Sequence, residues 1–404
     1  MKLQIAVTLA LVIGVTAACE PRVVQEALSV VTVERFTVGD TTVIISKGKA
    51  PTQRVDSVRV LWGNSPLLKD PRSMAKLGDR LIVADPTRLH AINLRGGAIE
   101  SMGREGGGPG EFRNLSAVAV DGLTTWTFDA ELLRLSVFDN RSLKFVRSMP
   151  MTPASVFVNP LRPRDTLRRS GAIFTFRREG IKVDSPTRTA LIRYDADGQA
   201  PAILRIWPDL DYTRLPMGVI GPRSVLGPRA ILAVSADARE VAYGQGLDYC
   251  VTIETLPTDQ AARTVERACR AWEPIRVGRG IRSPDFSKIE NEREGQVLQA
   301  ISRVQVVPTH LPSFDELRYD AYGRLWIRTL GKDLAEIHPA LLSRFPELGP
   351  DYRSWDVFGQ DRDLKQTIEL PAGFDPQVIL EDEAYGFFEW RTGEIVIAVI
   401  RWMI

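Results

Sequence analysis

Ten residues from Gly103 to Phe112, GREGGGPGEF, contain five glycines and one proline and end on an aromatic residue. Glycines allow positive φ and a sharp change of direction, whereas the proline restricts the backbone. A phosphate-binding loop would need Lys-Ser or Lys-Thr at a helix start, or Gly-x-Gly-x-x-Gly between a strand and a helix. Neither context surrounds these residues. The stretch lies between two strand-like runs, which favours a joint between repeated units, with Phe112 and Leu115 turned back into the core.

The runs on either side of this joint belong to a pattern that recurs along the chain. A short apolar strand, a turn with Asp or Gly and an aromatic or β-branched strand appear at 74–86, 117–130, 167–180, 231–246, 317–331 and 378–393. A second hairpin follows most copies, so each copy supplies about four short antiparallel strands. Radial repetition of four-stranded sheets is how a β-propeller limits exposed strand edges. The sequence therefore predicts an all-β, six-bladed β-propeller.

The ends of the repeat region predict how the ring closes. The last copy has only three strands, whereas an additional strand-like run, VDSVRVLWG at 55–63, precedes the first copy. Pairing this early run with the last blade would complete that blade and protect both edges. We therefore expect the propeller to span 55–404, after a tether and strand-like segment at 19–54.

The joint also carries a resemblance to a known family. GREGGGPGEF followed by AVAVDG and a strand with a tryptophan resembles the NHL-type repeat, and the chain is similar to bacterial six-bladed propeller proteins with such repeats. The resemblance is specific at the first two blades and extends to the others only as a pattern. It implies the six-bladed fold but no single activity, because one fold hosts many functions.

The N-terminus predicts export. Lys2 is followed by an apolar run, LQIAVTLALVIGVTAA, and then Cys19, which is the pattern of a signal peptide at 1–18. The small residues before Cys19 resemble the lipobox of bacterial lipoproteins, which implies lipidation of Cys19 and a place in the cell envelope, at the outer membrane or in the periplasm. Thr16 stands where the lipobox usually has leucine. A plain secretory signal is therefore the alternative.

Two further cysteines, Cys250 and Cys269, would then lie in an oxidising compartment. A hairpin centred between Asp259 and Gln260 places them directly opposite each other, close enough for a disulfide. The alternative is a pair of unpaired buried thiols. Two isolated cysteines fall short of a four-ligand metal site, so we predict no metal there.

Two insertions fall on one face of the predicted propeller, a helical one at 282–305 between blades four and five and a loop at 331–355. Ser283 to Asp285 has the character of a helix start. Apolar residues follow at near-helical spacing, namely Phe286, Ile289, Val297, Ile301 and Val304. A helix with one apolar side must cover something, so this face is the candidate binding face.

Cations gather on the same predicted face. Arg177, Arg328 and Arg391 end second strands, and Arg104 and Lys332 stand in neighbouring loops. Arginine binds carboxylate, sulfate and phosphate groups in planar, bidentate geometry, which predicts an anionic small molecule, glycan or protein as partner. The alternative is a solvated rim in which arginines pair with neighbouring carboxylates, namely Asp85, Asp129, Glu179 and Glu389.

Composition and chemistry narrow the function classes. The net charge is only +2, from 52 basic and 50 acidic residues, so neither nucleic acid nor a membrane surface is an expected partner, apart from the lipid anchor. The chain has three histidines, and they do not form a set of inner-strand metal ligands, so no cofactor is predicted. We therefore predict a cell-envelope binding or scaffold propeller and leave catalysis open, although the residues lean against it. The alternatives are an envelope hydrolase or lyase with an axial metal site, and a platform for a protein partner.

Overall fold

The computed structural model describes residues 31–402, except 64–66, 152–156, 161–165, 170–171, 180–183, 185, 196, 198, 219, 228, 236, 238, 257–262 and 391. At 121, 157–160, 166–169, 172–179, 186 and 217 it describes the backbone alone. The predicted signal peptide and Cys19 lie outside the described residues. Among the helices that are described, none has both the length and the apolar character needed to span a membrane.

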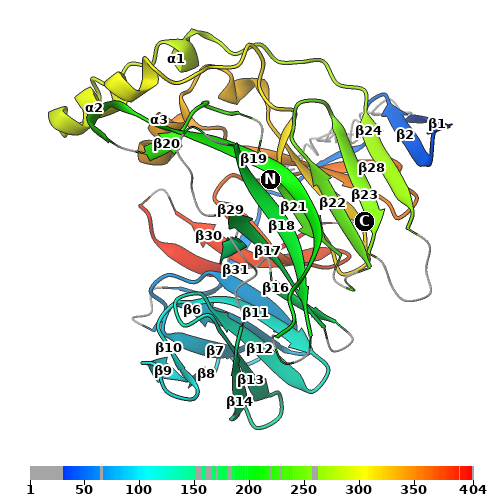
Figure 1. Cartoon of the computed structure of the whole chain (residues 1–404), viewed down its shortest axis with the longest axis vertical. Helices are drawn as coiled ribbons and strands as arrows, with labels where there is room; N and C mark the ends of the chain where they lie inside the picture. The colour runs from blue at the N-terminus through cyan, green and yellow to red at the C-terminus, as the bar shows by residue number, and fades with distance from the viewer. Residues whose placement is uncertain are drawn as a thin grey trace, which may run out of the picture.

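Strands dominate the described chain and form six sheets of mainly antiparallel pairs, each with four or more strands (Figure 1). The first sheet contains β5 (Ser73–Leu77), β6 (Arg80–Asp85), β7 (Arg88–Asn93) and β8 (Ile99–Met102). The second contains β11 (Leu115–Asp121), β12 (Thr124–Asp129), β13 (Arg134–Asp139) and β14 (Phe145–Pro150). The third contains β15 (Phe157–Pro160), β16 (Thr166–Arg169), β17 (Ala172–Glu179), β18 (Pro186–Tyr194), β19 (Ala202–Arg214) and β20 (Ile220–Pro222).

The other three sheets follow in chain order. The fourth contains β21 (Ile231–Val234), β22 (Glu240–Gly244), β23 (Cys250–Thr255) and β24 (Val265–Arg270). The fifth contains β25 (Phe314–Tyr319), β26 (Leu325–Thr329), β27 (Tyr352–Phe358) and β28 (Leu364–Pro371). The sixth contains β29 (Phe374–Ile379), β30 (Glu383–Glu389), β31 (Ile395–Arg401) and, from the N-terminal part of the chain, β4 (Val58–Trp62).

The pairing of β4 with β31 confirms the predicted union of the two ends. The strands run antiparallel, with Val58 opposite Ile400 and Val60 opposite Ala398. β31 has a continuous apolar sequence because protein packs on both of its faces, and its five central residues are buried. The chain ends of the repeat region thus share one sheet, in which β4 supplies the fourth strand.

The segment before β4 also adds strands to two sheets. β1 (Thr32–Val38) and β2 (Thr41–Lys47) form a hairpin, and β2 runs parallel to β24 at the edge of the fourth sheet. β3 (Thr52–Arg54) runs parallel to β28 of the fifth sheet. The predicted tether therefore contains an ordered hairpin that extends the fourth sheet to six strands.

Hydrophobic clusters join each sheet to the next along the chain, and one joins the sixth sheet to the first. Representative pairs from the six clusters are Ile82 with Phe138, Trp126 with Ile192, Leu191 with Leu232, Ile253 with Leu317, Trp355 with Ala398, and Ile397 with Leu81. Each fully buried large apolar side chain contributes about 1.5–3 kcal/mol relative to an exposed one. The core is thus divided among the junctions between sheets.

The glycine-rich stretch is a joint, as predicted. It lies between β8 of the first sheet and β11 of the second, and contains the short parallel pair β9 (Arg104–Glu105) and β10 (Glu111–Phe112). Gly103 and Gly110 have φ of 71° and 72°, in the left-handed region that favours glycine. A Cβ atom at Gly103 would lie 2.5 Å from the Phe112 ring. Phe112 and Leu115 are fully buried in the cluster between the first two sheets.

The predicted disulfide is also confirmed. β23 and β24 pair in the expected register, with Cys250 opposite Cys269, and a disulfide joins these two residues. The bond ties the two strands of the fourth sheet that lie next to the N-terminal hairpin.

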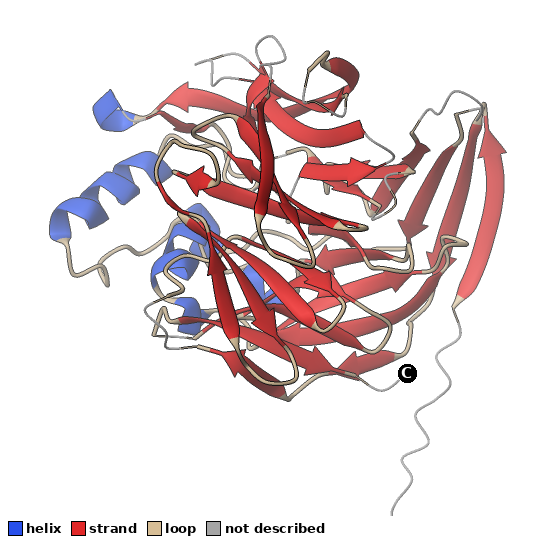
Figure 2. Ribbon diagram, turned by 90° about the horizontal axis from the view of Figure 1, so that it is seen from below, coloured by secondary structure: helices blue, strands red, loops and turns tan. Residues whose placement is uncertain are grey.

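Helices gather on one side of the sheets (Figure 2). They are α1 (Arg279–Arg282), α2 (Glu292–Ser302) and α3 (Pro339–Arg344), with short 3-10 turns η1 (Pro216–Gly218), η2 (Lys332–Leu334) and η3 (Pro346–Leu348). The long helix begins at Glu292 and not near Ser283, because the Asn291 side chain caps it by accepting the Glu294 N–H at 3.2 Å. The Asp285 carboxylate instead accepts the Ser287 N–H in a local turn. The predicted loop at 331–355 also contains the start of β27.

Candidate functional site: a capped cavity

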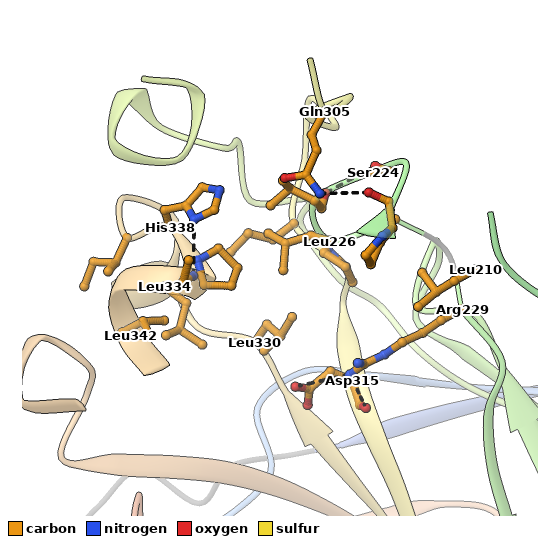
Figure 3. A pocket seen from close by; sticks show the side chains of 18 of the residues that line it. Leu210, Ser224, Leu226, Arg229, Gln305, Asp315, Leu330, Leu334, His338 and Leu342 are labelled. Atoms are coloured by element: carbon orange, nitrogen blue, oxygen red, sulfur yellow. Dashed lines mark hydrogen bonds and ion pairs between the residues drawn. The ribbon is translucent and has the colours of Figure 1, made fainter. Parts of the chain in front are cut away.

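A cavity of about 560 Å³ lies where the third, fourth and fifth sheets meet the two insertions (Figure 3). Most of its lining is apolar, with side chains from β19, β21, β25, α2, α3 and the loops between them. The apolar lining includes Leu210, Ile231, Leu298, Ile301, Phe314, Leu330, Leu334 and Leu342. Ligand sites of this size commonly combine apolar walls with a few fixed polar groups.

The two insertions, with the residues that flank them, form a cap over the cavity. Backbone hydrogen bonds anchor this cap to the third sheet. The Val225 N–H donates to the Val306 carbonyl, and the Val306 N–H donates to the Arg223 carbonyl, each at 3.0 Å. The Gln305 side chain donates to the Pro222 carbonyl at 2.8 Å. The segment just beyond β20 and the segment after α2 therefore form one edge of the cavity, as Figure 3 shows for Ser224 and Gln305.

Two glycines just before the first insertion bind the second insertion. The Gly278 N–H donates to the Ala335 carbonyl at 2.7 Å, and the Gly280 N–H donates to the Glu336 carboxylate at 3.2 Å. A Cβ atom built at Gly280 would lie 1.6 Å from the Glu336 carbonyl oxygen. Only glycine therefore permits this approach without displacement of the backbone.

We expect Gly280→Ala to loosen the cap, because the added methyl group must displace the Glu336 backbone. The expected result is about tenfold faster amide hydrogen exchange in residues 279–311 and 332–344, with little change in the six sheets. Hydrogen exchange followed by mass spectrometry measures this. Gly96→Ala is the matched control, since a Cβ atom there has no neighbour within 4 Å. Equal exchange in the two variants would contradict the expectation.

Helix α2 covers the cavity without burying its own apolar side. Leu298 and Ile301 line the cavity and are only partly buried, and Gly295 is the single buried residue of the helix. A soluble helix normally buries its apolar stripe against the core. A ligand in the cavity would complete the burial of α2.

The floor of the cavity is charged. Arg328 on β26 forms a bidentate pair with Asp315, with Nε to Oδ1 at 2.7 Å and Nη2 to Oδ2 at 2.9 Å. Its Nη1 atom lies 2.7 Å from Oε2 of Glu316. Burial alone would lower the pKa of Arg328, but these carboxylates raise it above its ordinary value. Arg229 donates to the Asp315 carbonyl at 3.1 Å, and Figure 3 shows the two side chains together, opposite Gln305 and His338.

Arg353 on β27 is the other charged residue of the lining. Among the described residues, no carboxylate lies within ion-pair distance of its guanidinium and no hydrogen bond engages it. The side chain is solvent-accessible, yet surrounding protein lowers the pKa of the guanidinium, and Arg328 adds to this effect. A guanidinium that faces a cavity can be accessible to water and still be surrounded by protein, which accounts for both its accessibility and its lowered pKa.

His338 belongs to the cap. Its Nδ1 atom accepts the Ala340 N–H at 3.2 Å and so caps α3, and its ring packs edge-on against Phe286. Burial lowers the pKa of His338, so the ring is neutral at pH 7. The charge of the lining therefore comes from Arg229, Arg328, Arg353 and Asp315.

Of the five predicted ligand residues, the structure places Arg328 in the cavity lining. Lys332 begins the turn η2 of the cap and is exposed, but it is not part of the lining. Arg104 lies in the joint, where it donates to Glu111 at 2.7 Å, far along the chain from the cap. The side chain of Arg177 and all of Arg391 lie outside what the structure describes. Arg229 and Arg353 were not predicted.

Two carboxylates assigned to the alternative of a solvated rim have other partners. Asp85 accepts the N–H groups of Lys69 and Asp70. Asp129 accepts N–H groups from four residues, namely Arg113, Asn114, Glu131 and Leu132. Both carboxylates are buried, so they hold loops in place and are not part of a solvated rim.

The described side chains contain no group of three or more His, Cys, Asp and Glu that could hold a metal ion. Asp315 of the lining and the adjacent Glu316 are both bound to arginines.

No family model and no curated protein matches the chain. The fold resembles that of several solved structures at low identity. An exported protein of Bacteroides fragilis, described as putative, shares 12% identity with a TM-score of 0.44, over 89% of this chain and 100% of that chain. Regucalcin, a calcium-binding protein of Agrobacterium tumefaciens, shares 10% with a TM-score of 0.42, over 88% and 98%. The β-propeller domain of Swd1 from Myceliophteria thermophila shares 9% with a TM-score of 0.39, over 85% and 98%.

Proposed function

We propose that this protein is a binding module of the cell envelope that holds a small molecule in the capped cavity of a six-bladed propeller. The observation that carries the proposal is the cavity itself, with its apolar walls, its charged floor and a helix whose apolar side is left for a ligand to cover. Pockets with this combination of features are the default candidates for ligand sites. We assign no reaction to the cavity.

The six sheets are the proposed blades. Support comes from the hydrophobic clusters that join each sheet to the next and the sixth to the first, and from the pairing of β4 with β31. In this arrangement the two insertions cover the cavity over the third, fourth and fifth blades. The NHL-type repeat is supported by the joint sequence alone.

The proposed location is the envelope, with a lipid anchor at Cys19. It is supported by the signal-like residues 1–18 and by the disulfide between Cys250 and Cys269, since structural disulfides persist in oxidising compartments. The alternative of a hydrolase or lyase requires a stoichiometric metal, which elemental analysis of the purified protein measures directly.

Filling the cavity tests the proposal. We expect octanoate or 1-octanol to bind wild-type protein with one site by isothermal titration calorimetry. Leu298→Trp places a large side chain in the cavity and should weaken that binding at least about tenfold, since one rejected methylene already costs about 1–3 kcal/mol.

Val304→Trp is the matched control, because Val304 follows α2, is 56% exposed and does not line the cavity. Its affinity should stay within about twofold of wild type. Absence of binding for both probes, or equal loss in both tryptophan variants, would overturn the proposed function.

A further inference from the structure

One cation at the floor of the cavity, Arg353, has no carboxylate partner among the described residues. Arg328 and Arg318 share Glu316, Arg318 also binds Asp375, and Arg328 and Arg229 share Asp315. In this network Arg328, Arg318 and Arg229 all have carboxylate partners among the described residues. Arg353 is the member of this network that has no hydrogen bond or ion pair among the described residues.

Such an unneutralised charge is unfavourable beside apolar walls. Arginine stays protonated at neutral pH, even where its pKa is lowered, so the guanidinium cannot escape the cost by losing its proton. Asp315 and Glu316 attract the guanidinium, but both carboxylates are already engaged by Arg328. An incoming anion would find a strong electrostatic partner, because the attraction is screened less in such a cavity than in water.

The part of the cavity opposite these arginines is suited to an apolar group of a ligand. Leu298 and Ile301 of α2 and Leu342 of α3 present apolar surface, and the histidine of the cap is neutral. Burial of an alkyl chain there removes apolar surface from water and so favours binding. A compact polyanion would leave this surface uncovered and would exceed the single unneutralised charge of the floor.

We infer that the ligand is an amphiphile with a single negative charge, whose anionic head contacts Arg353 and whose apolar part lies beneath α2. The inference rests on the proposed function and names the chemical class of its ligand. Arg353 is then the residue that sets the preference for an anion, with Arg229 beside the same end of the cavity.

Octanoate and 1-octanol form the test pair, because they share the alkyl chain and differ in the charge of the head. Titration calorimetry at pH 7.5 should show that wild-type protein binds octanoate at least about tenfold more tightly than 1-octanol, as expected for a charge-assisted contact. Arg353→Gln should remove this preference while binding of 1-octanol stays within about threefold. Arg353→Lys, which keeps the charge, should retain part of it.

Arg104→Gln is the matched control. Arg104 lies in the joint, where it binds Glu111, so its substitution should leave both affinities unchanged. If wild type binds 1-octanol as tightly as octanoate, the inference is overturned while the proposed function stands. If the preference for octanoate persists in Arg353→Gln, the assignment of Arg353 is overturned. Binding of neither probe overturns the proposed function and this inference together.

Discussion

Asp356→Asn is expected to lower the free energy of unfolding by about 3–5 kcal/mol, which is the cost of breaking a buried ion pair from one side. Asp356 on β27 has 0% exposure and accepts hydrogen bonds from the Tyr249 hydroxyl, from Arg270 and, at 2.6 Å, from the Thr367 hydroxyl. Tyr249 directly precedes β23 and Arg270 ends β24, both strands of the fourth sheet, whereas Asp356 and Thr367 belong to the fifth. The carboxylate therefore joins two sheets.

The directions of the pKa shifts agree with a buried network held together by the Asp356 carboxylate. Burial raises the pKa of Tyr249 well above its ordinary value, and Asp356 raises it further. Burial alone would lower the pKa of Arg270, but Asp356 and Tyr249 raise it. Asparagine carries no charge and keeps one acceptor oxygen, so the partly buried guanidinium of Arg270 loses its counter-charge and at least one of the donors to Asp356 loses its acceptor.

Urea unfolding followed by tryptophan fluorescence measures the loss. Asp79→Asn is the matched control, since Asp79 pairs with Arg95 on the surface and both side chains are largely exposed, so we expect a change below about 1 kcal/mol. The double variant Asp356→Asn with Arg270→Gln should recover part of the loss, because the unpaired charge is gone. A loss in Asp356→Asn no larger than in Asp79→Asn would show that the network does not hold the sheets together.

Local patterns in the sequence predicted the parts of the fold that depend on short-range chemistry. Alternation of apolar residues with a central turn sets the register of a hairpin, so Cys250 could be placed opposite Cys269. The joint was predictable for the same reason, because its glycines permit positive φ and Phe112 is an apolar residue that can pack into the core. The pairing of β4 with β31 was predictable for a different reason, because a strand without a partner at each end of a repeat leaves two edges to be covered.

Features that depend on long-range packing could not be predicted from local sequence patterns. The hairpin of β1 and β2 pairs with β24 across more than two hundred residues, and neither strand carries a motif that names its partner. The helix start was misplaced because Ser283 and Asn291 are both acceptable caps, and the tertiary contacts of Phe286 and Ile289 select the second.

In the cavity, too, local patterns revealed some residues and long-range packing determined the others. Arg328 was named as a candidate because it ends a clear second strand, but Arg353 was assigned to a loop. The alternation in YRSWDVF could have placed Arg353 on a strand, on the same side as Trp355, and so beside Arg328. No local signal could have brought Arg229, which precedes β21, to the same floor. Convergence of three arginines from two sheets is a property of the assembled sheets.

Ile397→Ala is expected to lower the free energy of unfolding by about 2–5 kcal/mol, through lost burial and the cavity that remains. Ile397 lies on β31 with 0% exposure, opposite Trp62 of β4 and Phe387 of β30. It also belongs to the cluster that contains Leu81 and Ile92 of the first sheet. The truncation therefore weakens the last sheet and its junction with the first at one position.

The sheets in which hydrogen exchange accelerates test the coupling of the sixth sheet to the first more sharply than the size of the stability loss does. Val60→Ala is the matched control, because Val60 lies on β4 of the same sheet but is 43% exposed, and we expect a change below about 1 kcal/mol. In Ile397→Ala, hydrogen exchange should accelerate in β5 to β8 as well as in β29 to β31, since the two sheets share the cluster that loses packing. Acceleration confined to the sixth sheet would mean that the first sheet holds its structure without the last. The ends of the repeat region would then share a sheet without coupling the sheets on either side of it.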